Sequence, residues 1–280
     1  YLFEFWAWDH QLAPEGDLRT WVILGGRGAG KTRAGAEWVR SMVEGSRPRD
    51  PGMARHVGLI GETMEQAREV MVFGASGILA CSPPDRRPQW ISGRNLLVWP
   101  NGAEARLYSA FDPERLRGPQ FDAVWADELA KWPKAQNTWD MMQFCLRLGK
   151  KPRACVTTTP KNVEILKDLM ARKSTVQTHA TTHANRAYLA DSFLTEVQER
   201  YAGTRLGRQE LEGVLLADVD GALWTSARLE AAHMSKLPEM DRIVVAVDPP
   251  AGANATSDAC GIIVAGIVSQ GPVSDWKIYV

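Results

Sequence analysis

A glycine-rich stretch, LGGRGAGKT at residues 24–32, allows few folds. It follows the apolar run at 21–24 and precedes RAGAEWVR, which reads as the first turns of a helix. Residues 25–32 satisfy the pattern G-x-x-x-x-G-K-[ST] between a predicted strand and a predicted helix, the context in which such a loop surrounds phosphate groups. The glycines let backbone N–H groups turn inward, and the start of the helix adds a partial positive charge. The sequence therefore predicts a phosphate-binding loop composed of Gly25, Gly26, Arg27, Gly28, Ala29, Gly30, Lys31 and Thr32.

Three side chains of this loop have expected roles. Lys31 is placed to reach the β- and γ-phosphates of a nucleotide, and the Thr32 hydroxyl is placed to ligate Mg²⁺. Arg27 is an additional cation inside the loop, which either contacts the γ-phosphate or points to solvent. The expected cofactors are ATP and Mg²⁺.

A phosphate-binding loop of this kind needs an acidic partner at the end of a neighbouring strand. In FDAVWADE, residues 121–128, an apolar run leads into Asp127 and Glu128. We expect Asp127 to hold the metal ion and Glu128 to activate the attacking water as catalytic base. The vicinal acids favour hydrolysis over transfer of phosphate to another substrate. A further strand, CVTTTP, ends in hydroxyl groups that are candidates to sense the γ-phosphate: Thr157, Thr158 and Thr159.

Strand and helix patterns alternate along much of the chain, which predicts an α/β fold around a mainly parallel sheet. Asn101 and Gly102 separate two apolar runs, so we expect an antiparallel hairpin there. Residues 188–216 have a helical pattern that is broken near Gly203, typical of a small helical subdomain. The strand patterns cover residues 20–26, 56–62, 95–110, 121–128 and 153–160, and the helical patterns cover 31–45 and 63–74.

The composition of the chain limits its expected partners and cellular environment. Lys plus Arg and Asp plus Glu each total 33, so a net charge of zero gives no global attraction to a polyanion. The four cysteines are far apart and form no CxxC pair, which favours a reducing, intracellular environment over a disulfide framework or a zinc site. We expect no membrane contact, because no apolar stretch approaches the roughly 18 residues of a membrane span and no leader pattern opens the chain.

The order of the phosphate-binding loop, RLRGPQFDAVWADELAKW, TTTPK, GTRLGRQELEG and GALW resembles the large terminase subunit of tailed bacteriophages and of phage-derived gene transfer agents. The resemblance covers nearly the whole chain and includes the arginine inside the loop. It implies an ATP-driven motor that pushes double-stranded DNA through a portal into an empty capsid, with a C-terminal endonuclease that cuts the DNA. Implied partners are the portal protein and the small terminase subunit, in a homo-oligomeric ring at the capsid portal in the bacterial cytoplasm.

The resemblance extends to residues with weaker local patterns. The family has an adenine-contacting segment before the first strand, which here offers Trp6 for stacking and Gln11 for the adenine edge; an N-terminal helix packed on the core is the alternative. Ring motors also place an arginine finger at a neighbouring subunit's γ-phosphate. Arg117 is the first candidate, ahead of Arg115, Arg205 and Arg208, and a surface salt bridge is the alternative for each. Thr157 to Thr159 match the family's coupling motif.

The last segment matches the start of the family's RNase H-like nuclease domain. Asp248 follows the apolar strand RIVVAV and is the expected metal ligand, whereas Asp258 more simply caps a turn. The remaining nuclease carboxylates would lie beyond Val280, so we expect an incomplete two-metal site and no cleavage. The predicted domains are a P-loop ATPase core at 1–187, a helical lid at 188–232, a linker at 233–241 and the start of the nuclease at 242–280.

Three other functions use a similar loop. A nucleotide kinase is disfavoured by Glu128 and by the second α/β module, and a nucleotide-dependent switch would use hydrolysis only as a timer. A helicase-like, DNA-dependent ATPase is the nearest alternative, because helicases share the Asp-Glu arrangement. Basal turnover and its stimulation by DNA distinguish the kinase and the switch from the motor. DNA contact would come from a local patch such as LRLGKKPR at 146–153, for which a solvated basic loop is the alternative.

Overall fold

The computed structural model describes residues 2–216, 224, 226–234, 236–249 and 260–280. The chain divides into two compact units, Tyr1–Ala227 and Arg228–Val280. Asp258 and most of GALW lie outside the described residues. In the part of the chain that is described, no helix combines the length and apolar character that a membrane span requires.

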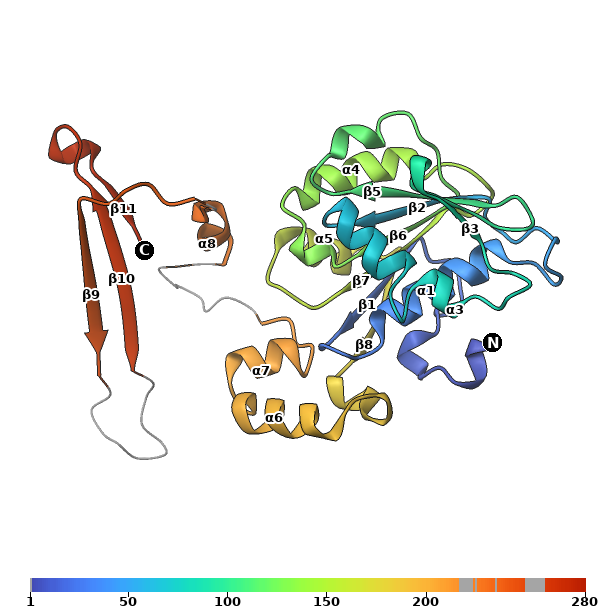
Figure 1. Cartoon of the computed structure of the whole chain (residues 1–280), viewed down its shortest axis with the longest axis horizontal. Helices are drawn as coiled ribbons and strands as arrows, with labels where there is room; N and C mark the ends of the chain where they lie inside the picture. Colours follow the sequence, from blue (N-terminus) through green and yellow to red (C-terminus); the bar gives the residue numbers. More distant parts are fainter. Residues whose placement is uncertain (1, 217–223, 225, 235, 250–259) are drawn as a thin grey trace. The chain divides into compact units, whose positions relative to one another are not determined.

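A twisted sheet forms the centre of the first unit (Figure 1). Its strands lie in the order β3-β4-β5-β2-β6-β7-β1-β8, and the pairings from β5 through β8 are parallel. The β3-β4-β5 edge is antiparallel. The strands are β1 Thr20–Gly25, β2 His56–Gly61, β3 Gln89–Ile91, β4 Leu96–Val98, β5 Glu104–Ser109, β6 Ala123–Asp127, β7 Arg153–Thr158 and β8 Thr175–Ala180.

Helices cover both faces of this sheet (Figure 1). The longer ones in the first unit are α1 Lys31–Val43, α4 Ala135–Cys145, α5 Glu164–Ala171 and α6 Asp191–Tyr201. The shorter α-helical segments are α2 Met64–Gln66, α3 Ile78–Cys81, α7 Arg205–Glu210 and, across the boundary of the two units, α8 Ser226–Ala232. The turns are η1 Phe3–Phe5, η2 Asp9–Gln11, η4 Ser92–Arg94, η5 Pro113–Leu116, η6 Leu129–Lys131 and η7 Thr182–Tyr188, with a π-helical segment, η3, at Ala67–Val72.

Alternation along the strands builds two cores, one on each face of the sheet. Trp21 and Ile23 of β1 pack into the same cluster as Trp125 of β6 and the apolar face of α1. Their neighbours Val22 and Leu24 pack into the other cluster, with α4 and α5. Both sets of side chains are buried, which is why the strands read as nearly continuous apolar runs in the sequence.

Helix α1 lies directly over strand β6 because of one small residue. A Cβ atom at Gly35 would overlap the indole ring of Trp125. The absence of a side chain at this point of the helix therefore lets a tryptophan pack against the helix backbone. The contact places the start of α1, which follows the phosphate-binding loop, beside the strand that carries the acidic pair.

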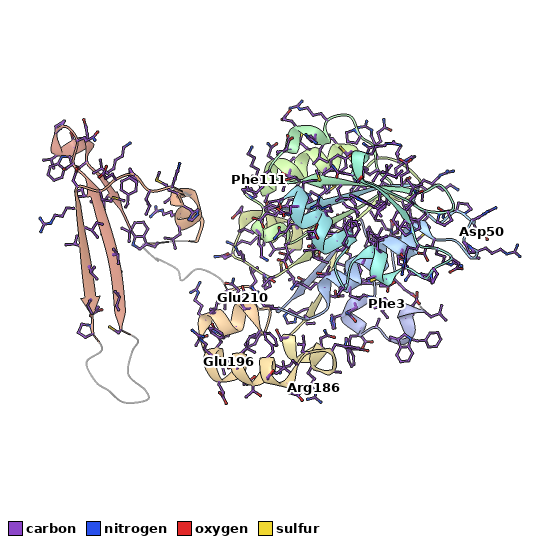
Figure 2. All side chains as sticks on the ribbon, viewed as in Figure 1. Phe3, Asp50, Phe111, Arg186, Glu196 and Glu210 are labelled. Carbon is purple, nitrogen blue, oxygen red and sulfur yellow. The ribbon has the colours of Figure 1, made fainter. Side chains whose placement is uncertain are left out.

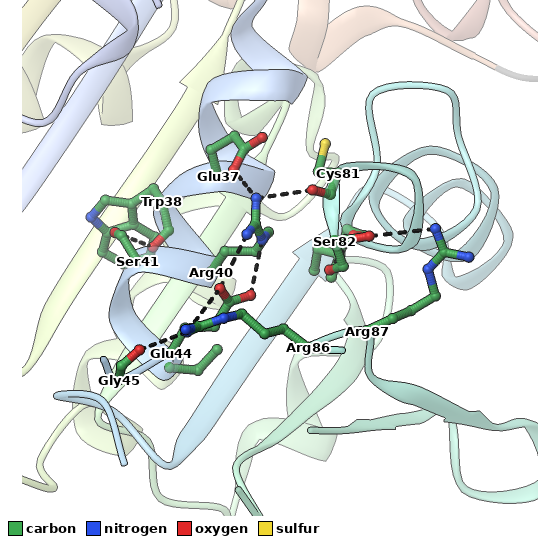
Figure 3. Close-up of polar contacts among 12 residues, drawn as sticks. Glu37, Trp38, Arg40, Ser41, Glu44, Gly45, Cys81, Ser82, Arg86 and Arg87 are labelled. Atoms are coloured by element: carbon green, nitrogen blue, oxygen red, sulfur yellow. Dashed lines mark hydrogen bonds and ion pairs between the residues drawn. The ribbon is translucent and has the colours of Figure 1, made fainter. Parts of the chain in front are cut away.

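A charged network holds the second half of α1 (Figure 3). The buried Arg40 guanidinium donates to the carboxylates of Glu37 and Glu44, at 2.6 and 2.9 Å, and to the carbonyl of Cys81 at 2.9 Å. Arg86 donates to the carbonyl of Gly45 at 2.6 Å. Because the buried guanidinium has both carboxylates and a carbonyl as partners, its desolvation is compensated. The network ties α1 to α3 and to the segment that follows α3.

The second unit is a small antiparallel sheet. Its strands are β9 Arg242–Asp248, β10 Gly261–Val268 and β11 Lys277–Tyr279, in the order β11-β10-β9, with a short turn, η8, at Val273–Asp275. Within the unit both faces of β9 are exposed, and its apolar side chains project on either side (Figure 2).

The α/β class and the mainly parallel sheet are confirmed, as are all five predicted strand regions of the first unit. The Asn101–Gly102 hairpin joins β4 to β5 as expected, and α6 and α7 flank the predicted break near Gly203. Strands β3 and β8 were not predicted. β3 has only three residues, and β8, TVQTHA, is polar in composition because it is an edge strand with partly exposed side chains.

Candidate functional site

The carboxyl ends of three adjacent strands bring the predicted site residues together. β7 lies between β6 and β1, with Asp127 paired to Thr157 and Leu24 paired to Thr158. The loop after β1, the acids at the end of β6 and the threonines at the end of β7 therefore share one edge of the sheet. Parallel strands in an open α/β sheet commonly place their ligand sites at this edge.

The loop after β1 adopts the conformation that its glycines predict. Gly28 and Gly30 have φ values of 75° and 84°, in the left-handed region that a residue with a side chain avoids. Lys31 begins α1, and its ammonium donates to the carbonyls of Gly25 and Gly26 at 2.9 and 3.0 Å and to Thr159 Oγ1 at 3.2 Å. All three donors of the ammonium are thus directed to the loop and to the end of β7. Burial lowers the pKa of Lys31, and the charges of Glu128 and Asp127 partly oppose that shift.

Asp127 is the most strongly perturbed acid in the site. Its carboxyl group is buried, and Thr157 Oγ1 donates to Oδ1 at 2.6 Å. Burial, and secondarily the charge of Glu128, raises the pKa of Asp127 to about 7, although the bond from Thr157 and the charge of Lys31 act in the opposite direction. A buried acid with a strongly raised pKa is a candidate member of a functional site.

Glu128 adopts an unusual backbone conformation. Its φ of 53° and ψ of 44° lie in the left-handed region, which is rare for a residue with a long side chain. Its N–H donates to the carbonyl of Thr157 at 2.6 Å. Oε2 accepts from the N–H of Thr159 at 3.4 Å and forms an ion pair with Lys131 Nζ at 3.3 Å. Neighbouring strands and η6 therefore hold this strained residue in place.

The three threonines at the end of β7 have different contacts. Thr157 accepts from Trp125 Nε1 at 2.9 Å and donates to Asp127. Thr158 accepts from the N–H of Ala130 at 3.1 Å and donates to the carbonyl of Thr159. Thr159 contacts both Lys31 and Glu128. The threonine that joins the phosphate-binding loop to the acidic pair is therefore Thr159.

A cavity of about 560 Å³ opens above these groups. Its lining includes the loop residues from Arg27 to Thr32, together with Glu128, Lys131 and Thr159. Asp127 does not line it. A second cavity, of about 750 Å³, lies between the N-terminal segment and the second half of α1; no residue of the loop at 25–32 lines it, but Gln11 does. Its charged lining residues include Glu37, Arg40 and Glu44, which bind one another (Figure 3).

Residues from distant parts of the chain support the phosphate-binding loop. The N–H of Arg27 donates to the carbonyl of Glu210 at 2.6 Å, and its guanidinium lies 3.5 Å from the Glu210 carboxylate. Thr182 Oγ1 donates to the carbonyl of Arg27 at 2.7 Å, and Asn185 Nδ2 donates to the carbonyl of Gly28 at 2.7 Å. Arg27 thus has an acidic partner on α7, besides the phosphate and solvent alternatives that its position in the loop suggests.

Four other residues predicted for the site do not line the cavity of about 560 Å³: Trp6, Gln11, Arg117 and Asp248. Trp6 is 72% exposed. Gln11 is buried, and its Nε2 donates to the carbonyl of Gly30 at 3.2 Å, which puts it against the loop. Arg117 pairs with Glu114 on the surface and does not line the cavity. Asp248 ends β9 in the second unit, where it is exposed. Their predicted roles stay predictions.

Several residues of the site were missed from the sequence. Lys131 lies one short turn after Glu128, and that spacing was the available signal. Asn185, Thr182 and Glu210 had none, because they reach the loop from positions more than 150 residues away. In the described residues no group of three His, Cys, Asp or Glu side chains is arranged to hold a metal ion.

Comparison with known families adds an independent observation. The family described as terminase large subunit, T4likevirus-type, N-terminal, matches residues 22–231. The chain belongs to this family. No curated protein matches it by sequence.

Solved structures of large terminases share the fold. The large terminase ATPase domain of Thermus phage P74-26 has 18% identity and a TM-score of 0.51, covering 73% of this chain and 94% of that one. The large terminase of another thermophilic bacteriophage, in complex with ADP, has 15% identity and a TM-score of 0.56, covering 94% of this chain and 63% of that one. The HK97 bacteriophage large terminase has 14% identity and a TM-score of 0.51, covering 93% and 58%. This terminase chain therefore spans less than two thirds of the length of the last two.

Proposed function

We propose that this chain is the ATP-hydrolysing motor part of a large terminase that drives double-stranded DNA into a viral capsid. The observation that carries the proposal is the meeting of Lys31, Thr159 and Glu128 at one cavity, on a fold of the terminase family. The family match favours this function over a helicase-like ATPase. One of the similar large terminase structures is in complex with ADP, which supports nucleotide binding by this chain.

In this mechanism the loop residues 25–32 surround the phosphates with their backbone N–H groups, and Lys31 places its charge against the β- and γ-phosphates. Glu128 orients a water molecule toward the γ-phosphate and accepts its proton. Thr159 links Lys31 to Glu128, so we assign the coupling role to it within the Thr157 to Thr159 segment.

The residues present also fit Mg²⁺. Thr32 offers a hydroxyl oxygen at the start of α1, and Asp127 offers a carboxylate, which are the hard oxygen ligands that Mg²⁺ prefers. The raised pKa of Asp127 is consistent with a carboxyl group whose charge is compensated only when a cation is present. When bound, the ion would neutralise charge on the phosphates.

The remaining assignments complete the proposal. Trp6 and Gln11 contact the adenine, and Arg117 reaches a neighbouring subunit in a ring. The portal protein and the small terminase subunit are the partners at the capsid, in the cytoplasm of a bacterial host. The core at 1–187, the lid at 188–232 and the linker at 233–241 precede the start of an endonuclease at 242–280, in which Asp248 is a metal ligand.

Steady-state ATP hydrolysis by the purified chain tests the central claim. Lys31→Ala should abolish nucleotide binding, because the phosphate charge loses its cation, and Glu128→Gln should bind ATP but hydrolyse it at least about a hundredfold more slowly. Stimulation of turnover by duplex DNA separates a motor from a switch, and transfer of phosphate to an acceptor would identify a kinase. Wild-type turnover in Lys31→Ala would refute the nucleotide site.

A further inference from the structure

Lys131 is a cation of the cavity that the roles above leave unused. It ends the short turn η6, Leu129–Lys131, directly after the acidic pair. The turn is firmly held, because Leu129 is fully buried and the N–H of Ala130 donates to Thr158 Oγ1. The Lys131 side chain, in contrast, lines the cavity together with the phosphate-binding loop. A rigid backbone therefore presents a long, charged side chain to the place where the phosphates are expected.

The partner of Lys131 distinguishes it from the other cations of the cavity. Arg27 pairs with Glu210 and Arg33 pairs with Glu37, and neither carboxylate lines the cavity. Lys31 is directed to backbone carbonyls and Thr159. Among the described lining residues, the Lys131–Glu128 ion pair is the one in which both members face the cavity. The Lys131 ammonium therefore contacts one oxygen of the Glu128 carboxylate, the group that orients water in the proposed mechanism.

This ion pair is easy to exchange. Its length is 3.3 Å, and the side chains of Lys131 and Glu128 are 36% and 23% exposed. Such partly solvated pairs contribute little net stability. A γ-phosphate carries more negative charge than a carboxylate and offers more acceptor oxygens, so it competes well for a lysine ammonium.

We propose that Lys131 is a γ-phosphate ligand that pairs with Glu128 in the empty site and exchanges the carboxylate for the phosphate when a nucleoside triphosphate binds. The exchange releases Glu128 to orient water only when there is a γ-phosphate to attack. A diphosphate lacks the group that draws the ammonium away, so the pair persists. This inference rests on the proposed nucleotide site and adds to it a residue that discriminates triphosphate from diphosphate.

The test is a comparison of ADP and ATPγS binding by calorimetry, with Mg²⁺, in the full chain. Lys131→Ala should weaken the affinity for ATPγS by about tenfold, the order expected for one charge-assisted contact. The affinity for ADP should stay nearly unchanged. Lys131→Arg should restore most of the preference. Lys134→Ala is the matched control, because Lys134 lies three residues further on and contacts the carbonyl of Phe111 instead. It should bind both nucleotides as the wild type does.

A double-mutant cycle gives a second readout that does not depend on loss of the lysine alone. Glu128→Gln should tighten ATPγS binding, because no ion pair with Glu128 has to be broken before Lys131 binds the phosphate. This gain in affinity should disappear in the Lys131→Ala background. An equal gain in both backgrounds would overturn the exchange, as would parallel weakening of ADP and ATPγS in Lys131→Ala. Failure of the wild-type chain to bind either nucleotide would instead overturn the nucleotide site itself.

Discussion

The carboxyl group of Asp127 shows how the site balances its charges residue by residue. It is buried beside a second acid, and these two causes raise its pKa from 3.8 to about 7. The Thr157 hydroxyl and the Lys31 ammonium offset only part of that shift. Trp125 in turn donates to Thr157, so a line of contacts leads from the core of the sheet to the carboxyl group. The pKa of Asp127 therefore depends both on the packing of the sheet and on the neighbouring charges.

A pH dependence follows for the nucleotide-free and metal-free protein. Because the folded pKa of Asp127 is raised, the folded state holds a proton that the unfolded chain releases above about pH 4. This stabilising contribution is complete below that pH and is lost as the pH rises toward 7. Urea unfolding in EDTA at pH 5 and 7.5 should show a fall in the free energy of unfolding. Asp127→Asn should reduce the fall by on the order of 2 kcal/mol, and equal falls in both proteins would contradict the prediction.

Gly35 offers a prediction in which two residue-level effects oppose each other. Alanine is the better helix former by about 1 kcal/mol, but its Cβ would overlap the Trp125 ring, and overpacking of this kind costs about 2 kcal/mol or more. We expect the cost of the overlap to exceed the gain in helix propensity. Gly35→Ala should therefore lower the free energy of unfolding by about 1 kcal/mol or more in chemical denaturation. Gly93→Ala is the control, because a Cβ there meets open space. A Gly35→Ala protein as stable as the wild type would mean that α1 can move away from β6.

At the scale of elements, helix α7 and the segment after it pack on the phosphate-binding loop. The N–H of Thr182 donates to the carbonyl of Leu211 at 2.7 Å, and the N–H of Arg27 donates to Glu210. His179 at the end of β8 contacts the carbonyl of Gly213 at 3.0 Å. The loop is therefore in direct contact with the helical segment that leads toward the second unit. A change in the loop on nucleotide binding has a physical route to that segment.

The Arg27–Glu210 pair tests this contact. The two side chains are 69% and 26% exposed, so Glu210→Gln should change the free energy of unfolding by less than about 0.5 kcal/mol. The variant frees the Arg27 guanidinium for phosphate, and the KM for ATP should fall by about threefold. Glu196→Gln on the exposed face of α6 is the control (Figure 2). If both variants have the wild-type KM, Glu210 does not compete with the nucleotide for Arg27.

On the scale of the whole molecule, the two units differ in what they bury. The first has apolar clusters on both faces of its sheet, whereas the second exposes apolar side chains such as Ile243, Val245 and Ile263. The proposed ATP site is composed of residues of the first unit. The first unit thus has the core that independent folding requires.

We therefore expect a chain shortened to residues 1–227 to keep its fold and its basal ATP hydrolysis, within about twofold of the full chain. Thermal unfolding and steady-state turnover are the measurements. Asp248→Ala in the full chain is the milder comparison and should also leave hydrolysis intact, because Asp248 belongs to the other unit. Loss of turnover in both would show that the ATP site depends on the second unit.

The phosphate-binding loop, the acidic pair and the parallel strands other than β8 could be predicted from the sequence, because the pattern of each lies within a few consecutive residues. The run at 25–32 needs only its flanking strand and helix to be recognised, and Asp127 and Glu128 directly follow an apolar strand. The hairpin at Asn101 and Gly102 is equally local. Such local patterns can be recognised without knowledge of the rest of the chain.

Only the tertiary structure decided which residues meet. Thr159 contacts Lys31 across 128 positions of sequence, and Glu210 contacts Arg27 across 183. Both pairings depend on the placement of β7 and β8 on either side of β1, which no local pattern encodes. The partly buried Lys131–Glu128 pair is close in sequence, but its meaning comes from the cavity that both side chains line. The difference is the separation in sequence. Local motifs can be recognised because their residues are consecutive, whereas contacts between distant residues form only when the strand order brings them together.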